Sequence, residues 1–144
     1  MSGSIVQWRF GRNPSVSVPH NAQLACELQE AGEMLVYLSP DYLETAGHRT
    51  WTPRICHQYI TGHMLLSVLY EVAVFGRVPD TKPEYGQMLR LLVKGGMVYP
   101  VSQVEYTVTS SALEHLRSMA DLKPVEFAAM ARRLGSTYLA LAAD

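Results

Sequence analysis

The sequence predicts an α+β fold that is mostly α-helical, and three observations support this prediction. A long apolar segment from Thr52 to Gly76 contains a single internal glycine and no proline beyond its first turn. Two short β-like runs, 97–101 and 104–108, follow a Gly-Gly pair. Apolar side chains at helical spacing return near the C-terminus. Together these features predict a central buried helix, a helix-hairpin-helix unit and a C-terminal amphipathic helix.

Length and composition indicate one globular domain with a small N-terminal addition. The chain has 144 residues, of which 48% are apolar, which is enough for a real core. We expect residues 1–50 to form a strand and helix extension packed on the core built by residues 51–144. The formal net charge of −1 excludes a global attraction to nucleic acid or to an anionic membrane.

The two cysteines indicate a reducing compartment. Cys26 and Cys56 form no disulfide framework and no metal-ligand spacing, so we expect free thiols and neither a metal nor a cofactor. The first residues also lack the apolar run of a signal peptide. These features predict a cytoplasmic protein.

The N-terminal region is expected to contain a strand, a candidate second short strand at Val16 and Val18, and two helices. Alternating apolar residues over 6–10 predict a half-buried strand. Helical spacing then predicts a helix from Asn21 to about Leu38, which Gly32 weakens. The alternative is that Gly32 ends the helix and that residues 34–38 form a strand. A short second helix is expected from Ser39 to Gly47.

The central segment has the end signals of a single helix. Thr52 is a suitable N-cap, Pro53 suits the first helical position and Gly76 can adopt the left-handed conformation that ends a helix. A helix that is apolar all round is either a membrane span or the buried axis of a soluble fold. Polar residues interrupt the run too often for a span, which favours a core helix; they are Gln58, His63 and Glu71.

The segments that follow alternate between helix and strand. Thr81 and Glu84 have capping-box spacing, so a helix is expected from Thr81 to about Lys94, ended by Gly95-Gly96. Strands at 97–101 and 104–108 are expected to flank a tight turn at Ser102-Gln103, and Pro100 confines the first strand to an edge.

Two further helices complete the chain. The first is expected after Thr109 and through Ala120, with Ser111 and Glu114 as a second capping box. The last starts near Pro124, and small residues in it allow close packing on the central helix or on a second copy. Its apolar stripe consists of Phe127, Met130, Leu134, Tyr138 and Leu141.

The order of elements from residue 52 to residue 120 resembles a winged-helix domain. The segment that carries the resemblance is LRLLVKGGMVYPVSQVEYTVTSSALEHL. In that family a recognition helix ends at glycine, a two-stranded wing follows, and a Thr- or Ser-capped helix packs behind it. The resemblance covers about half of the chain and implies DNA binding by a winged helix-turn-helix protein.

The resemblance implies that the helix at 81–94 would enter a major groove. Its outer side carries Lys82, Gln87, Arg90 and Lys94, whereas apolar residues face inward. In this arrangement Arg90 would read guanine and Gln87 adenine, while the two lysines would meet phosphates. The alternative interpretation is a solvated helix face without a specific role.

Two departures from the family favour contact with a protein instead. The wing turn contains Glu105 and no Lys or Arg, and residues 77–80 leave little room for a middle helix. An aromatic anchor patch of Trp8, Tyr42 and Trp51 would then bind the partner.

A polar line along the central helix invites comparison with a catalytic triad. His63, Ser67 and Glu71 follow at steps of four, with Cys56 further back. Side chains on successive turns point in parallel rather than toward one reacting atom, which favours a buried polar stripe. We therefore expect a non-enzymatic DNA-binding transcription regulator acting as a homodimer without a membrane segment. The alternative is a protein–protein adaptor or inhibitor on the same scaffold.

Overall fold

The computed structural model describes residues 22–37, 50–78 and 83–143, and it confirms a mostly α-helical fold with one small antiparallel sheet. The described elements are α2 (Ala22–Glu27), α3 (Gln29–Tyr37), α5 (Pro53–Phe75), α6 (Pro83–Lys94), β1 (Val98–Pro100), β2 (Tyr106–Val108), α7 (Ser110–Met119) and α8 (Pro124–Ala143). The strand expected at 6–10 and the helix expected at 39–47 lie outside the described residues.

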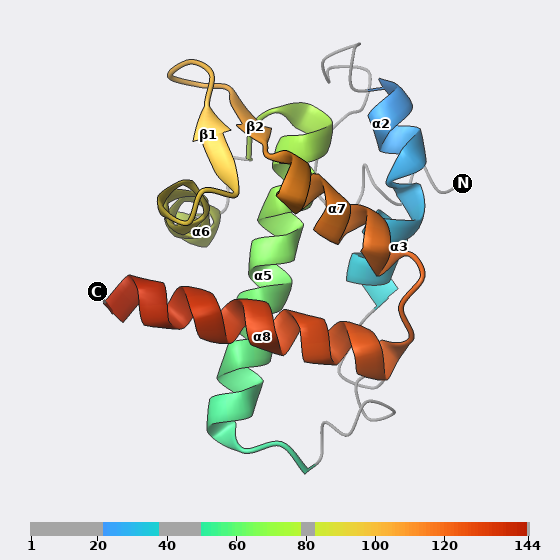
Figure 1. Cartoon of the computed structure of the whole chain (residues 1–144), viewed down its shortest axis with the longest axis vertical. Helices are drawn as coiled ribbons and strands as arrows, with labels where there is room; N and C mark the ends of the chain where they lie inside the picture. The colour runs from blue at the N-terminus through green and yellow to red at the C-terminus, as the bar shows by residue number, and fades with distance from the viewer. Residues whose placement is uncertain (1–21, 38–49, 79–82, 144) are drawn as a thin grey trace.

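Helix α5 is the axis around which the other elements pack (Figure 1). It begins where expected, because Thr52 Oγ1 accepts from the backbone N–H of Ile55 at 3.2 Å. It ends at Gly76, whose φ of 77° is left-handed. Every residue from 65 to 75 is buried, so α5 is covered on all sides over that length. No described helix is long and apolar enough to cross a membrane.

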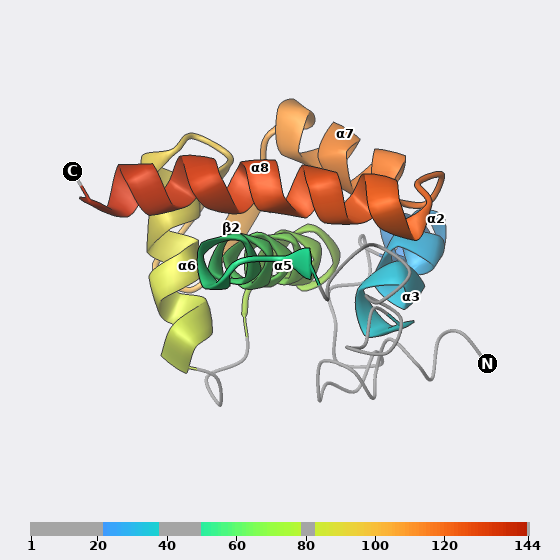
Figure 2. The same cartoon turned by 90° about the horizontal axis from the view of Figure 1, so that it is seen from below.

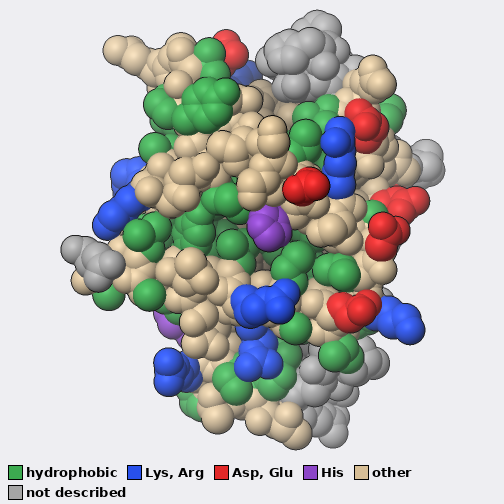
Figure 3. Space-filling view, viewed as in Figure 1, with side chains coloured by type: hydrophobic (Ala, Val, Ile, Leu, Met, Phe, Trp, Pro, Cys, Tyr) green, Lys and Arg blue, Asp and Glu red, His purple; other side chains and the backbone are tan. Residues whose placement is uncertain are grey.

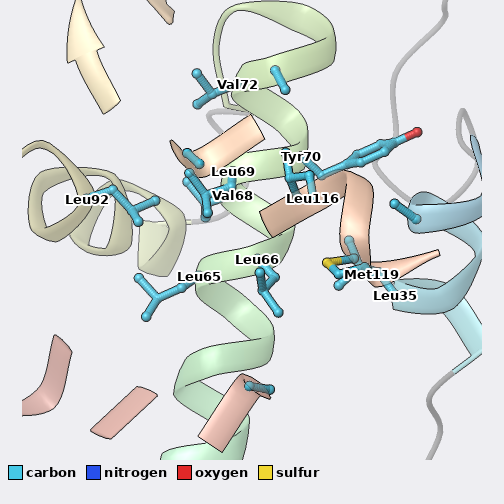
Figure 4. Close-up of a cluster of buried hydrophobic side chains, with 14 of the residues drawn as sticks. Leu35, Leu65, Leu66, Val68, Leu69, Tyr70, Val72, Leu92, Leu116 and Met119 are labelled. Carbon is cyan, nitrogen blue, oxygen red and sulfur yellow. The ribbon is translucent and has the colours of Figure 1, made fainter. Parts of the chain in front are cut away.

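The core combines buried side chains from α3, α5, α6, α7 and α8 with Val98 of β1. Leu65, Leu66 and Leu69 of α5 contact apolar residues that reach in from α3, α6 and α7 (Figure 4). The labelled partners in that view are Leu35, Leu92, Leu116 and Met119. Helices α2 and α3 therefore contribute to the same core as the C-terminal elements.

Helix α8 crosses α5 at backbone contact (Figures 1 and 2). A Cβ placed on Gly62 would overlap the backbone of Ala131, and one placed on Gly135 would overlap the carbonyl of Gln58. Only glycine allows two helices to approach so closely. The stripe expected for α8 packs on the core, with Phe127 and Tyr138 buried and Met130, Leu134 and Leu141 half-buried. The buried small residues beside it are Ala128, Ala131 and Gly135.

The helix expected from 21 to 38 is divided. α2 and α3 separate at Leu28, although the Gly32 N–H still bonds to the Leu28 carbonyl at 2.9 Å. Gly32 does not end the helix. It lies against the phenol of Tyr70, and a Cβ there would lie 2.7 Å from Tyr70 Oη.

The hairpin after α6 is shorter than expected. β1 pairs with β2 in an antiparallel register that joins Val98 to Val108. The connection spans residues 101–105 rather than the two residues expected, because Ser102 Oγ accepts from the backbone N–H groups of Val104 and Glu105. At the start of β2, the Tyr106 N–H donates to the Gly76 carbonyl at 2.7 Å, which fixes the hairpin to the end of α5.

Two helix starts show how the chain enters α7 and α8. Thr109 is the N-cap of α7, and its Oγ1 accepts from the Ala112 N–H at 3.3 Å. The capping box expected at Ser111 and Glu114 is therefore wrong, because α7 has already begun at Ser110. Ahead of α8, the Lys123 N–H donates to Glu126 Oε1 at 2.9 Å.

Candidate nucleic-acid interface

Helix α6 separates its apolar and polar residues onto two sides. Tyr85, Leu89 and Leu92 are buried against the rest of the fold. Gln87, Arg90 and Lys94 are exposed, whereas Lys82 lies outside the described residues. The sequence thus anticipated which way three of the four candidate DNA-contacting side chains face.

The C-terminal end of α6 is connected to the C-terminal end of α8. A Schellman motif closes α6, with the Met97 N–H on the Leu92 carbonyl at 2.9 Å and Gly96 at a φ of 78°. Lys94 Nζ donates to the Leu141 carbonyl at 3.2 Å, near the negative end of the α8 dipole. An ammonium has three donors, so two remain for other acceptors.

Arg90 lies in the middle of the exposed side. A Cβ placed on Gly86 would lie 3.9 Å from Arg90 Nη1, so the guanidinium folds back over that glycine one turn earlier. Gly86 leaves space around the guanidinium, and the Arg90 fork can therefore change direction at little steric cost. A planar fork of this kind suits the O6 and N7 acceptors of guanine.

The hairpin beside α6 exposes apolar side chains. Tyr99, Val101 and Val104 are 54%, 64% and 65% exposed, and hydrophobic side chains gather over this corner in Figure 3. Glu105 is the only charged residue from 97 to 109. Such a hairpin offers a contact surface for apolar groups and no cation for a phosphate.

Two members of the polar line on α5, His63 and Ser67, lie within hydrogen-bond distance of backbone carbonyls. His63 Nε2 lies 3.0 Å from the Leu35 carbonyl, and Ser67 Oγ donates to the His63 carbonyl at 3.0 Å. The Ser67 hydroxyl thus faces backbone and not the His63 ring, so these residues do not form a nucleophile–base pair. Glu71, which lies about two turns after His63 on α5, is completely buried. Among the described residues, no group of His, Cys, Asp and Glu has the geometry to hold a metal ion.

Trp51 is not an exposed anchor, in contrast to the expectation. It is half-buried, its ring centroid lies 5.3 Å from that of Tyr59, and Arg132 Cζ lies 5.7 Å from the same ring. Trp8 and Tyr42, its expected companions, lie outside the described residues.

The structure also reveals a cluster that sequence reasoning missed. Tyr59 has its ring centroid 6.0 Å from that of His63 and 6.4 Å from that of Phe127. With Trp51 and Arg132 these residues form what we call the Trp51 cluster. The only sequence signal for it was the step of four from Tyr59 to His63, because Phe127 and Arg132 come from a helix that is distant in sequence.

No family model matches this sequence, and no curated protein or solved structure shows significant similarity to it.

Proposed function

We propose that this protein is a small non-enzymatic DNA-binding regulator that acts as a dimer and reads DNA with α6. The observation that carries the proposal is the exposed row of Gln87, Arg90 and Lys94 beside a two-stranded hairpin. In this proposal Arg90 and Gln87 contact base edges and Lys94 contacts phosphate, as the resemblance to winged-helix domains implies.

The distribution of charge supports this choice of surface. The exposed basic residues of the described ranges are spread over the ends of α5, α6, α7, the loop before α8 and α8: Arg54, Arg77, Arg90, Lys94, Arg117, Lys123 and Arg133. The exposed acidic residues of α2, α3, α7, the loop before α8 and the first turn of α8 are Glu27, Glu30, Glu114, Asp121 and Glu126, whereas Glu84 is the exposed acidic residue of α6 and Glu105 that of the hairpin. Figure 3 shows acidic side chains concentrated away from α6. An uneven distribution of acidic charge favours approach of a polyanion from the side with fewer carboxylates.

The proposed dimer would use the outer side of α8. The inner side is buried against α5 of the same chain, through Ala128, Ala131 and Gly135. A two-fold pair of α6 helices would then match a palindromic DNA site.

The test measures binding to duplex DNA at increasing salt, first with random sequence and then with a selected preferred site. We expect retention that falls with salt, and we expect Arg90→Ala to weaken binding to the preferred site by about 1–3 kcal/mol. Lys123→Ala is the matched control, because it also removes one exposed cation but lies between α7 and α8. Equal losses for both variants would reject α6 as the reading element, and no salt-dependent retention would reject the proposal.

A second candidate function is binding of another protein through the hairpin. The exposed Tyr99, Val101 and Val104 favour it, since apolar side chains at a projecting corner are typical of contact surfaces. A complex lost with Val101→Ser and Val104→Ser together, but kept with Arg90→Ala, would select this candidate over DNA.

A further inference from the structure

The outer side of α8 carries two opposite charges seven residues apart. Glu126 and Arg133 are both exposed, and their spacing places them on the same side of the helix, about 10 Å from each other along its axis. Ion pairs within a helix join residues three or four apart, so these two side chains are too distant to pair. Among the described residues, neither of them takes part in an ion pair with any other side chain.

The Glu126 carboxylate is held in place and retains an open acceptor. Its Oε1 accepts from the Lys123 N–H at 2.9 Å, which orients the side chain at the start of α8. Its second oxygen remains for another donor. The Arg133 guanidinium has the planar set of donors that a carboxylate prefers. The two groups are complementary in charge and shape, but only a second helix that runs in the opposite direction brings them together.

The surface between the two charges allows another helix to approach. Ala129 is exposed and lies between Glu126 and Arg133 on the same side, and a small side chain permits a short distance between helix axes. Val125, beside Glu126, is 57% exposed, so it offers apolar surface for burial. In Figures 1 and 2 no described helix or strand covers this side of α8.

We propose that α8 packs antiparallel against α8 of a second copy of this chain, with Glu126 of each copy paired to the partner's Arg133. This interface rests on the dimer of the proposed function and specifies its register. In a two-fold interface the same patch is used twice, so one complementary pair of residues produces two ion pairs. A parallel pair in register would instead oppose Glu126 to Glu126 and Arg133 to Arg133, which is repulsive.

The register also sets the distance between the two copies of α6. The two-fold axis passes near Ala129 and Met130, midway between Glu126 and Arg133. Leu141, whose carbonyl accepts from Lys94 Nζ at 3.2 Å, lies about 17 Å along α8 from this axis. The two Lys94 ammonium groups would therefore lie about 34 Å apart along the helix pair, which is close to one turn of B-DNA. The charge pairing on α8 and the spacing of DNA half-sites thus lead to the same register, although neither depends on the other.

The first experiment tests the register by disulfide cross-linking of the full chain with Cys26→Ser and Cys56→Ser. Under mild oxidation Ala129→Cys should form a covalent dimer on a non-reducing gel, because the two copies of this position meet at the axis with Cα atoms less than about 7 Å apart. Ala140→Cys is the matched control, since it is exposed on the same side of α8 but lies about 16 Å from the axis. Equal cross-linking of both variants, or none at position 129, would overturn the proposal.

The second experiment exchanges the charges. Glu126→Arg alone and Arg133→Glu alone should each lose the dimer peak on a sizing column, because each change opposes like charges twice. A mixture of the two variants should recover the dimer, since one copy then carries both arginines and the other both glutamates. Glu126→Arg also removes the acceptor of the Lys123 N–H, so circular dichroism is used to confirm that this variant is folded. Single variants that remain dimers, or a folded mixture that remains monomeric, would contradict the proposed ion pairs.

DNA binding is measured separately on the same proteins. A dimer with the expected cross-linking and charge-exchange pattern, but without salt-dependent retention on DNA, would support the α8 interface and reject the DNA-binding proposal. A folded parent chain that stays a monomer at every concentration would overturn the α8 interface, whether or not α6 binds DNA.

Discussion

Single glycines have opposite roles in two helices of this protein. Gly135 faces α5 so closely that an added Cβ would overlap the Gln58 carbonyl, whereas a Cβ at Gly86 on α6 would meet only Arg90 Nη1 at 3.9 Å. Both look alike in the sequence, as glycines inside helical patterns. The residue across from a glycine decides its role, and that residue belongs to another helix.

The first prediction compares alanine at these two positions. Gly135→Ala should destabilise the protein by about 3 kcal/mol or more, because helix backbone cannot move aside as a flexible side chain can. Gly86→Ala should stabilise it by up to about 1 kcal/mol through better helix propensity and a less flexible unfolded chain. Urea unfolding of the two variants beside the parent measures both effects. Equal effects at the two positions would show that α8 does not cross α5 at backbone contact.

At the scale of elements, capping residues in the sequence predicted most ends of the described helices. The prediction failed at α7, where two residues were both suitable N-caps. Thr52, Gly76 and Gly96 act as expected, because a cap depends on residues within one turn. Before α7, Thr109 and Ser111 are both good caps by residue type. Thr109 is used, and its Oγ1 also lies 3.3 Å from the Met97 carbonyl, to which it can donate. That second contact depends on the hairpin and could not be read from the local sequence.

The second prediction tests this cap directly. Thr109→Ala should cost about 1–2 kcal/mol, because the Ala112 N–H loses its acceptor and the Met97 carbonyl loses a donor. Ser111→Ala lies inside α7 and should change stability by less than about 0.5 kcal/mol. Thermal unfolding followed by circular dichroism measures both. A larger cost at Ser111 would contradict the observed start of α7.

At the scale of the whole molecule, the sequence predicted the fold class and the central role of α5. The signal for α5 was a run of apolar residues with a clear start and end. This signal is local and does not depend on which other segments pack against the helix. The Trp51 cluster was not predictable, because it joins residues about seventy positions apart, from Tyr59 to Phe127. Of the candidate DNA-binding set, helical spacing predicted that Gln87, Arg90 and Lys94 face outward, but it could not predict the contact from Lys94 to Leu141.

The third prediction concerns stability at high pH. Burial raises the pKa of the Tyr59, Tyr70 and Tyr138 hydroxyls, and for Tyr70 the carboxylates of Glu71 and Glu33 add to the shift. Unfolded tyrosine loses its proton near pH 10, whereas these folded hydroxyls keep theirs to higher pH. Above about pH 10 the unfolded state therefore binds fewer protons, and stability falls as pH rises.

The expected slope is about 1.4 kcal/mol per pH unit for each fully buried tyrosine in this range. Urea midpoints measured from about pH 9 to about pH 11 test it. Tyr59→Phe should make the decline shallower, and Tyr99→Phe, on the exposed hairpin, is the matched control. A decline that Tyr59→Phe leaves unchanged would contradict the burial of that hydroxyl.

The hydrogen bond from Lys94 to the Leu141 carbonyl couples phosphate binding by Lys94 to fraying of the last turn of α8, which would otherwise be independent. If Lys94 turns toward a phosphate, the final turn of α8 gives up its cationic cap and frays more readily. By thermodynamic reciprocity, any contact that stabilises the last turn of α8 through its bond to Lys94 then lowers the affinity of Lys94 for phosphate. Amide hydrogen exchange at the end of α8, with and without DNA, would make this antagonism visible.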